Sequence, residues 1–199
     1  MEYRNSLFAL LLVFGVSNVA LADYEEGLDA VFRGDYQTAF REFSVAAENG
    51  LDLAQYNLAI LYFTGQGVKQ DLEQAFKWTE AAALQGHLAA QANLGSLYIE
   101  GSGVIEDVET GIAWFSAAGR GGHANSAFAL ANMYFDGDPV ERDYAMAHAW
   151  ASMALLHEHP EAEAFRNRVE RRLDSEELSA ARRTYARWQI EPPRLPETP

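Results

Sequence analysis

Three stretches of this sequence decide the fold, and the first of them reads Ala54-Gln-Tyr-Asn-Leu58-Ala-Ile-Leu-Tyr62. The second is Ala90-Gln-Ala-Asn-Leu94-Gly-Ser-Leu-Tyr98, and the third is Ser126-Ala-Phe-Ala-Leu130-Ala-Asn-Met-Tyr134. Their tyrosines lie at positions 62, 98 and 134, so each copy follows the last by 36 residues. A constant period of this length indicates a stack of repeated supersecondary units.

Other residue types recur at the same spacing of 36 residues, which excludes a chance similarity between the three copies. This spacing links Gly65, Gly101 and Gly137, then Val68, Val104 and Val140, then Asp71, Asp107 and Asp143, and then Trp78, Trp114 and Trp150. Gly86 and His87 recur once, as Gly122 and His123.

Each copy predicts two amphipathic helices. Leu58, Leu61 and Tyr62 recur at helical spacing in the first, and Ala75, Trp78 and Ala82 do so in the second. Asp71 precedes the second helix as an N-cap, with Gln74 three residues later. Small alanines at matching heights let the paired helices approach closely, and we expect Trp78 and Trp114 to be interior wedges.

The repeated pattern resembles the Sel1-like repeat family, a relative of the tetratricopeptide repeats. The resemblance is carried by A-Q-x-N-L-(G/A)-x-L-Y, G-x-G-V-x-x-D, A-x-x-W-x-x-x-A-A and Q-G-H, which run from Ala54 to His87 and again from Ala90 to His123. The third copy departs more, since Pro139 replaces the second loop glycine. The resemblance implies an all-α fold, an α-solenoid of antiparallel helix pairs with a C-terminal helical cap, and a role in binding other proteins.

The repeats divide the chain. We predict a signal peptide over 1–22, an atypical helix pair over 23–50, three repeats over 51–157, capping helices over 158–190 and a Pro-rich tail over 191–199. The terminal segments depart from the repeat because the end of a solenoid has one face in water.

The first residues predict export. An apolar run over 7–16 is about half the length needed to span a bilayer, and Ala20-Leu21-Ala22 fits a small-x-small cleavage site. The alternative is an N-terminal anchor that stays in the membrane. With cleavage, we expect no stable membrane insertion, and a periplasmic location if the source is Gram-negative or secretion otherwise.

Composition excludes several classes of function. The chain has 29 acidic and 15 basic residues, a formal net charge of −14, so phosphate backbones repel it and nucleic acid is excluded as a partner. It contains no cysteine, which removes disulfides, thiolate metal sites and cysteine nucleophiles. Residues 161–199 hold 8 arginines and 8 acidic residues, so the repeats carry the acidic excess.

The sequence offers no residue for catalysis. Gly65-Gln-Gly67 lacks the third glycine and the preceding strand of a phosphate loop. His157-Glu158-His159 has no third metal ligand placed by spacing. We therefore expect no enzyme activity, no metal and no cofactor, and structural roles for His87 and His123.

Function is instead expected on a periodic row along the first helices of the repeats, where we predict that another protein or peptide binds. We call it the first-helix row; its members are Tyr56, Ile60, Phe63, Ser96, Ile99, Phe128, Asn132 and Phe135. In a solenoid of helix pairs, the first helices line the concave surface, and an apolar strip there accepts a helix or an extended peptide. The alternative is that these side chains pack helix against helix.

These observations predict an exported scaffold that binds another protein and assembles or regulates an envelope or secretion-related complex. Two alternatives stay open. One is an immunity protein that neutralises a secreted effector, and the other is an envelope enzyme or a binder of cell-wall fragments.

Overall fold

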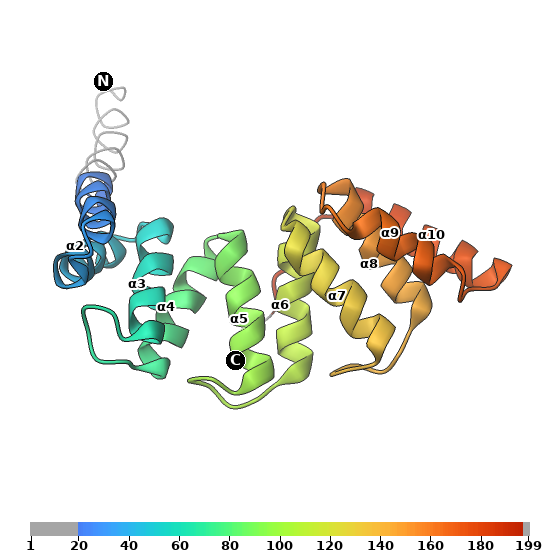
Figure 1. Cartoon of the computed structure of the whole chain (residues 1–199), viewed down its shortest axis with the longest axis horizontal. Helices are drawn as coiled ribbons and strands as arrows, with labels where there is room; N and C mark the ends of the chain where they lie inside the picture. The colour runs from blue at the N-terminus through green and yellow to red at the C-terminus, as the bar shows by residue number, and fades with distance from the viewer. Residues whose placement is uncertain (1–19, 197–199) are drawn as a thin grey trace, which may run out of the picture. The chain divides into compact units, whose positions relative to one another are not determined.

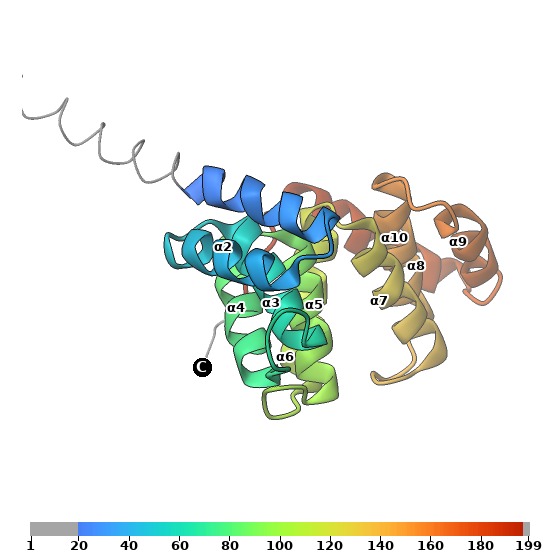
Figure 2. The ribbon, with the colours of Figure 1, turned by 60° about the vertical axis from the view of Figure 1, so that its left-hand side comes forward.

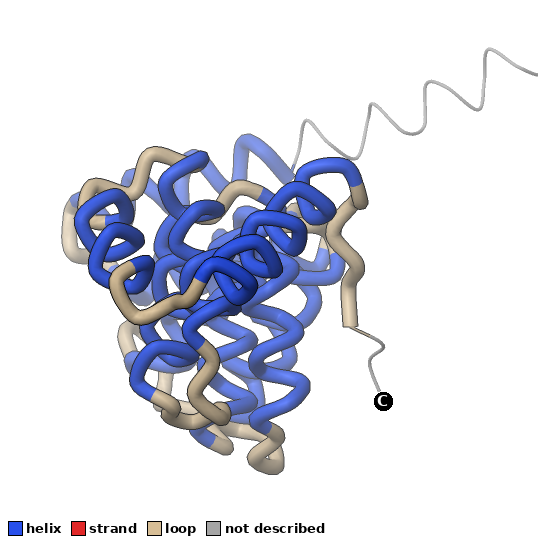
Figure 3. Tube along the Cα trace, turned by 90° about the vertical axis from the view of Figure 1, so that its right-hand side faces the viewer, coloured by secondary structure: helices blue, strands red, loops and turns tan. Residues whose placement is uncertain are grey.

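The computed structural model describes residues 20–196, and these residues form helices and loops without any strand (Figure 3). The predicted signal peptide therefore lies almost wholly outside the described residues. The chain divides into two compact units, one of residues 1–90 with 102–104 and the other of 91–101 with 105–199.

The first unit contains helix pairs joined in chain order (Figure 1). A helix over residues 20–32 is followed by α2 (Tyr36–Glu48), α3 (Asp52–Thr64) and α4 (Leu72–Leu84). Helix α2 packs on α3, and α3 packs on α4. The core of this unit gathers Phe43, Leu58 and Leu61 with a set of alanines, and Trp78 packs against it half-buried.

The second unit continues the pattern with α6 (Val108–Gly121), α7 (Ala124–Asp136) and α8 (Tyr144–Leu156), preceded by α5 (Leu88–Glu100), whose last ten residues belong to it. Successive helices from α6 to α9 are in contact. Trp114 and Trp150 are fully buried here. The expectation of an interior wedge is therefore confirmed for Trp114, whereas Trp78 is covered only in part.

Small residues set the spacing within each pair, as predicted. A Cβ added to Gly111 of α6 would lie 2.7 Å from the carbonyl oxygen of Gly95 in α5. Ala131 of α7 and Ala147 of α8, at the equivalent heights of the next pair, are completely buried. The paired helices therefore touch backbone to backbone at these heights, and a larger side chain would separate them.

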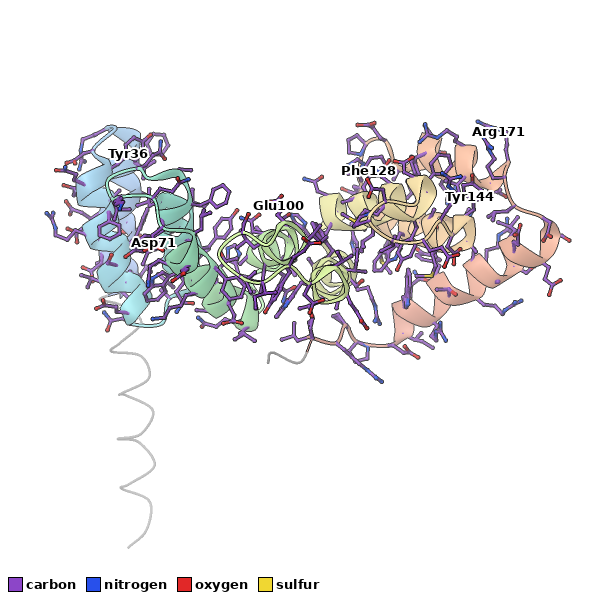
Figure 4. The ribbon with its side chains drawn as sticks, turned by 90° about the horizontal axis from the view of Figure 1, so that it is seen from below. Tyr36, Asp71, Glu100, Phe128, Tyr144 and Arg171 are labelled. Carbon is purple, nitrogen blue, oxygen red and sulfur yellow. The ribbon has the colours of Figure 1, made fainter. Side chains whose placement is uncertain are left out.

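The caps and loops follow the predicted chemistry. The carboxylates of Asp71, Asp107 and Asp143 each accept the backbone N–H three residues on, at 2.9–3.0 Å. Gly67 combines a φ of +73° with a close approach, because a Cβ there would lie 2.0 Å from the carbonyl oxygen of Tyr36. The loop between α3 and α4 thus rests against the start of α2 (Figures 2 and 4).

The C-terminal helices differ from a repeat. Helix α9 (Ala162–Glu170) packs on α8, and α10 (Ser175–Ile190) also packs on α8 instead of forming a hairpin with α9. Trp188 of α10 lies 4.2 Å from Trp150, centroid to centroid. Residues 191–196, which follow α10, form no helix or strand, and Arg120 of α6 donates hydrogen bonds to the carbonyls of Glu191 and Pro192.

Candidate protein-binding surface

The part of the first-helix row on α3 is open to solvent. Phe63 exposes 43% of its surface, and Ile60 and Tyr56 are half-buried on the same side of the helix. Leu53, one turn before Tyr56, is 39% exposed. Leu58, on the opposite side of α3, is buried in the core. The face of α3 that carries Phe63 is therefore exposed, whereas the face that carries Leu58 packs in the core.

Tyr56 also has a role inside the chain. Its ring stacks on His87 with centroids 4.5 Å apart, and the His87 ring nitrogen Nδ1 accepts the backbone N–H of Ala90. His87 thereby caps the start of α5 and carries Tyr56 on its other surface. A structural role for His87 is confirmed, and Tyr56 is only partly available to a partner.

The same ring pair recurs at the other end of the repeats. Phe128 of α7 stacks on His159 with centroids 3.9 Å apart, and Nδ1 of His159 accepts the backbone N–H of Glu161. His159 stands 36 residues after His123, which caps α7 through the backbone N–H of Ser126. His159 thus continues the period of His87 and His123, although the third copy lacks the glycine that precedes the other two histidines.

The middle of the first-helix row contributes to packing. Ile99 of α5 is half-buried against the core of the second unit, and its Cγ1 would lie 2.6 Å from a Cβ added to Gly111 of α6. Ser96, one turn earlier, is half-buried. For Ile99 the helix-packing alternative therefore holds.

The last part of the row is covered by the chain itself. Phe165 of α9 lies 5.3 Å from Phe128 and 5.4 Å from Phe135, measured between ring centroids. Phe135 also approaches Tyr144 of α8 at 5.4 Å, and Asn132 donates its side-chain amide to the carbonyl of Phe128. Both phenylalanines remain half-buried, so α9 occupies this strip without sealing it.

Helix α9 occupies the position of another first helix. Ala162 is fully buried like Ala54 and Ala90, which precede it by multiples of 36 residues, and Val169 is buried like Leu61 and Leu97. In this register Arg168 and Arg171 fall where Ile60 and Phe63 stand on α3. The sequence signal was therefore present in the period, but arginines in place of apolar residues concealed it.

Charge distinguishes the two ends. Residues 20–90 contain 11 acidic and 4 basic residues. Helix α9 and its C-cap carry three arginines, of which Arg168 and Arg171 are exposed. Under the same helices, burial lowers the pKa of His148 of α8, although Glu170 lies 3.6 Å from its Nε2. Burial also lowers the pKa of His123.

The described residues, 20–196, contain no group of three metal-ligating side chains. A cavity of about 440 Å³ opens beside α10 and is lined by Arg120, Trp188 and the tail over 191–193, among others. None of the described helices combines the length and the apolar character needed to cross a bilayer.

Comparison with known proteins agrees with this architecture. The family model described as Sel1 repeat matches four segments, 16–51, 52–87, 88–123 and 124–159. The first of them includes the helix pair that the sequence pattern left outside its three repeats. A search of curated proteins found no match to the chain.

Among solved structures, a Sel1 repeat protein from Oxalobacter formigenes is 27% identical, with a TM-score of 0.68 over 86% of this chain and 72% of that one. The protective antigen c5321 of uropathogenic Escherichia coli is 26% identical, with a TM-score of 0.43 over 85% and 45%. The immunity protein Pa5087 of Pseudomonas aeruginosa is 22% identical, with a TM-score of 0.37 over 88% and 86%. At TM-scores below 0.5, the last two likenesses do not extend to function.

Proposed function

We propose that this chain, which belongs to the Sel1 repeat family, is a scaffold that holds another protein against the open face of α3. Sel1 repeats typically serve protein–protein interaction. The observation that carries the proposal is the exposure of Phe63 on a face that also bears Ile60 and Leu53. Large apolar side chains aligned on one exposed helix face are characteristic of binding surfaces.

The mechanism is burial of the partner's apolar side chains along this face. Complete burial of one phenylalanine side chain is worth about 1.5–3 kcal/mol. The acidic residues of the first unit would attract basic groups of the partner towards α3 and repel acidic groups there, which gives selectivity more than affinity. No catalytic step is needed for this role.

The test is site-specific cross-linking. A photoreactive phenylalanine analogue at position 63 should capture the partner in the native host, and the same analogue at Val45 of α2 is the control. Val45 is 40% exposed and lies outside the first-helix row. Equal capture from both positions, or none from position 63, would reject the proposal.

The captured protein, once purified, permits a quantitative test. Phe63→Ala should weaken its binding at least about tenfold, whereas Val45→Ala should leave binding unchanged. Circular dichroism of both variants should stay helical, because neither side chain belongs to the buried core.

We place this scaffold outside the cytoplasm, in an envelope or secretion-related complex. The support is the apolar run over 7–16 and the cleavage pattern ending at Ala22. Mass spectrometry of the protein from fractionated cells should find a mature chain that begins at Asp23 outside the cytoplasm. An uncut chain in the cytoplasmic fraction would contradict this location.

A further inference from the structure

We propose that Arg168 of α9 binds a carboxylate, and that it recognises an acidic partner segment in which an Asp or Glu stands beside a large apolar residue. The proposal rests on the proposed function, because it names the chemistry of the partner at the C-terminal end of the first-helix row. It concerns only residues of the second unit.

The guanidinium of Arg168 is held in place by two aromatic rings. Its central carbon lies 4.8 Å from the ring centroid of Phe135 and 4.6 Å from that of Phe165. A guanidinium over aromatic faces is stabilised by the ring quadrupoles, and its N–H groups stay free to pair with a carboxylate in a bidentate way. The rings therefore orient the cation before a ligand arrives.

The chain does not supply that carboxylate itself. Glu170, two residues away, is paired with Arg182 of α10 at 3.3 Å and approaches His148 at 3.6 Å. Within the described residues 20–196, no carboxylate forms an ion pair with Arg168. Arg168 is therefore oriented by its neighbours but not paired with a carboxylate, so it can pair with a carboxylate of another molecule.

The position of Arg168 on α9 and the residues around it determine which kind of carboxylate-bearing segment can bind there. Arg168 falls at the place that Ile60 and Asn132 hold on other first helices, and Arg171 follows one turn later at the end of α9. Both arginines are exposed, and Figure 4 marks Arg171 with Phe128 and Tyr144 in the same unit.

Phe135, over which the guanidinium lies, is half-buried and offers apolar surface next to the cation, and Phe128, on the other side of Phe165, is half-buried too. A segment that pairs a carboxylate with an aromatic or aliphatic side chain uses both features. A phosphate group alone would pair with the guanidinium but would leave the apolar surface unused.

The experiment measures fluorescence anisotropy with two labelled hexapeptides. One is Gly-Glu-Glu-Leu-Phe-Gly and the other is Gly-Gln-Gln-Leu-Phe-Gly, both carrying the same fluorophore on the N-terminus and an amide at the C-terminus, so that the side chains carry the only charge difference. The full chain should bind the acidic peptide at least about fivefold more tightly at low salt, and the difference should shrink as salt is raised. Equal binding of the two peptides would overturn the proposal.

Variants separate this site from general attraction. Arg168→Met keeps an apolar stem over the two rings and removes the charge, so it should abolish the preference for the acidic peptide without unfolding the protein. Arg168→Lys should retain a part of it. Arg183→Ala removes an exposed charge from α10 and should leave the preference unchanged. Equal losses in Arg168→Met and Arg183→Ala would reduce the effect to net charge and overturn the proposal.

The experiments distinguish a failure of the carboxylate site from a failure of the proposed function. Phe63→Ala should leave the peptide preference intact, because Phe63 lies in the other unit. If the cross-linked partner depends on Phe63 while the peptides do not discriminate, the scaffold function stands and the carboxylate site is rejected. If the peptides discriminate while position 63 captures nothing, the scaffold proposal fails and the site stands.

Discussion

Helices α3 and α7 carry the same row of positions, but only one of them leaves it open. Phe63 on α3 is exposed, whereas Phe135, two periods later, is covered by Phe165 and Arg168 of α9. The repeats are alike in sequence at these positions, so the difference comes from what packs against them. The strip that we propose as a binding surface on α3 is, on α7, the place where α9 of the same chain packs.

The two units also differ in how they cover the equivalent tryptophans, and this predicts the largest effect. Trp114→Ala should lower the free energy of unfolding by about 3–5 kcal/mol, because a fully buried indole leaves a cavity. Trp78→Ala should cost clearly less, because Trp78 is half-buried. Urea denaturation followed by circular dichroism measures both values, and equal losses would contradict the difference in burial.

Removing the cover on α7 should make the two strips alike. Phe165→Ala should lower the free energy of unfolding by about 3 kcal/mol, since Phe165 is almost completely buried between Phe128 and Phe135. The uncovered rings should also raise the fluorescence of a bound hydrophobic dye. Leu173→Ala, a change in a half-buried residue after α9, is the control. An unchanged stability in Phe165→Ala would mean that α9 does not hold this strip.

Acid should weaken the covered end. Burial holds the pKa of His148 below its unfolded value of about 6.5, so the unfolded chain binds a proton more readily than the folded one. The stability that neutral His148 gives the folded state is fully present above about pH 6.5, and it is lost as the pH falls from there towards the pKa of the folded state. Glu170 of α9 attracts the proton, while Arg166 of α9 and Arg182 of α10 oppose it.

Denaturation midpoints of the parent chain and of His148→Gln, measured from pH 8 to pH 5, test this. The parent should lose more stability than the variant over this range. His123 should behave in the same direction, since burial lowers its pKa as well, and it remains in both proteins. Parallel curves for the two proteins would exclude His148 as the source.

The smallest effect is expected on the open strip. Phe63→Ala should change the free energy of unfolding by no more than about 0.5 kcal/mol, because its side chain is exposed. Phe135→Ala should cost about 1–2 kcal/mol, since that ring contacts Phe165 and Tyr144. Thermal and urea unfolding compare the pair directly, and a larger loss in Phe63→Ala would place Phe63 in the core.

Much of the fold could be predicted from local patterns. The period placed the helix pairs, and the cap residues Asp71, Asp107 and Asp143 bond as expected. The open face of α3 followed from helical spacing alone. These features depend on contacts within a few residues or within one helical hairpin. Because the sequence is repeated, the pattern that specifies those contacts occurs several times.

The part that could not be predicted lies where the period fades. Arg168 replaces an apolar residue and Phe165 stands where earlier repeats have Asn57 and Asn93, so the register of α9 was concealed. Helix α10 packs on α8, and no spacing rule foresees that contact. Neither arrangement is repeated elsewhere in the chain.

The sequence by itself determined the repeat length, the helix pairs and their caps. Those properties follow from side-chain chemistry at fixed spacing along one helix. The tertiary structure alone decided which part of the first-helix row stays exposed, because the residues that cover Phe128 and Phe135 come from α9, outside the three repeats. Exposure is a property of what packs on a surface, and the repeat pattern does not carry that information.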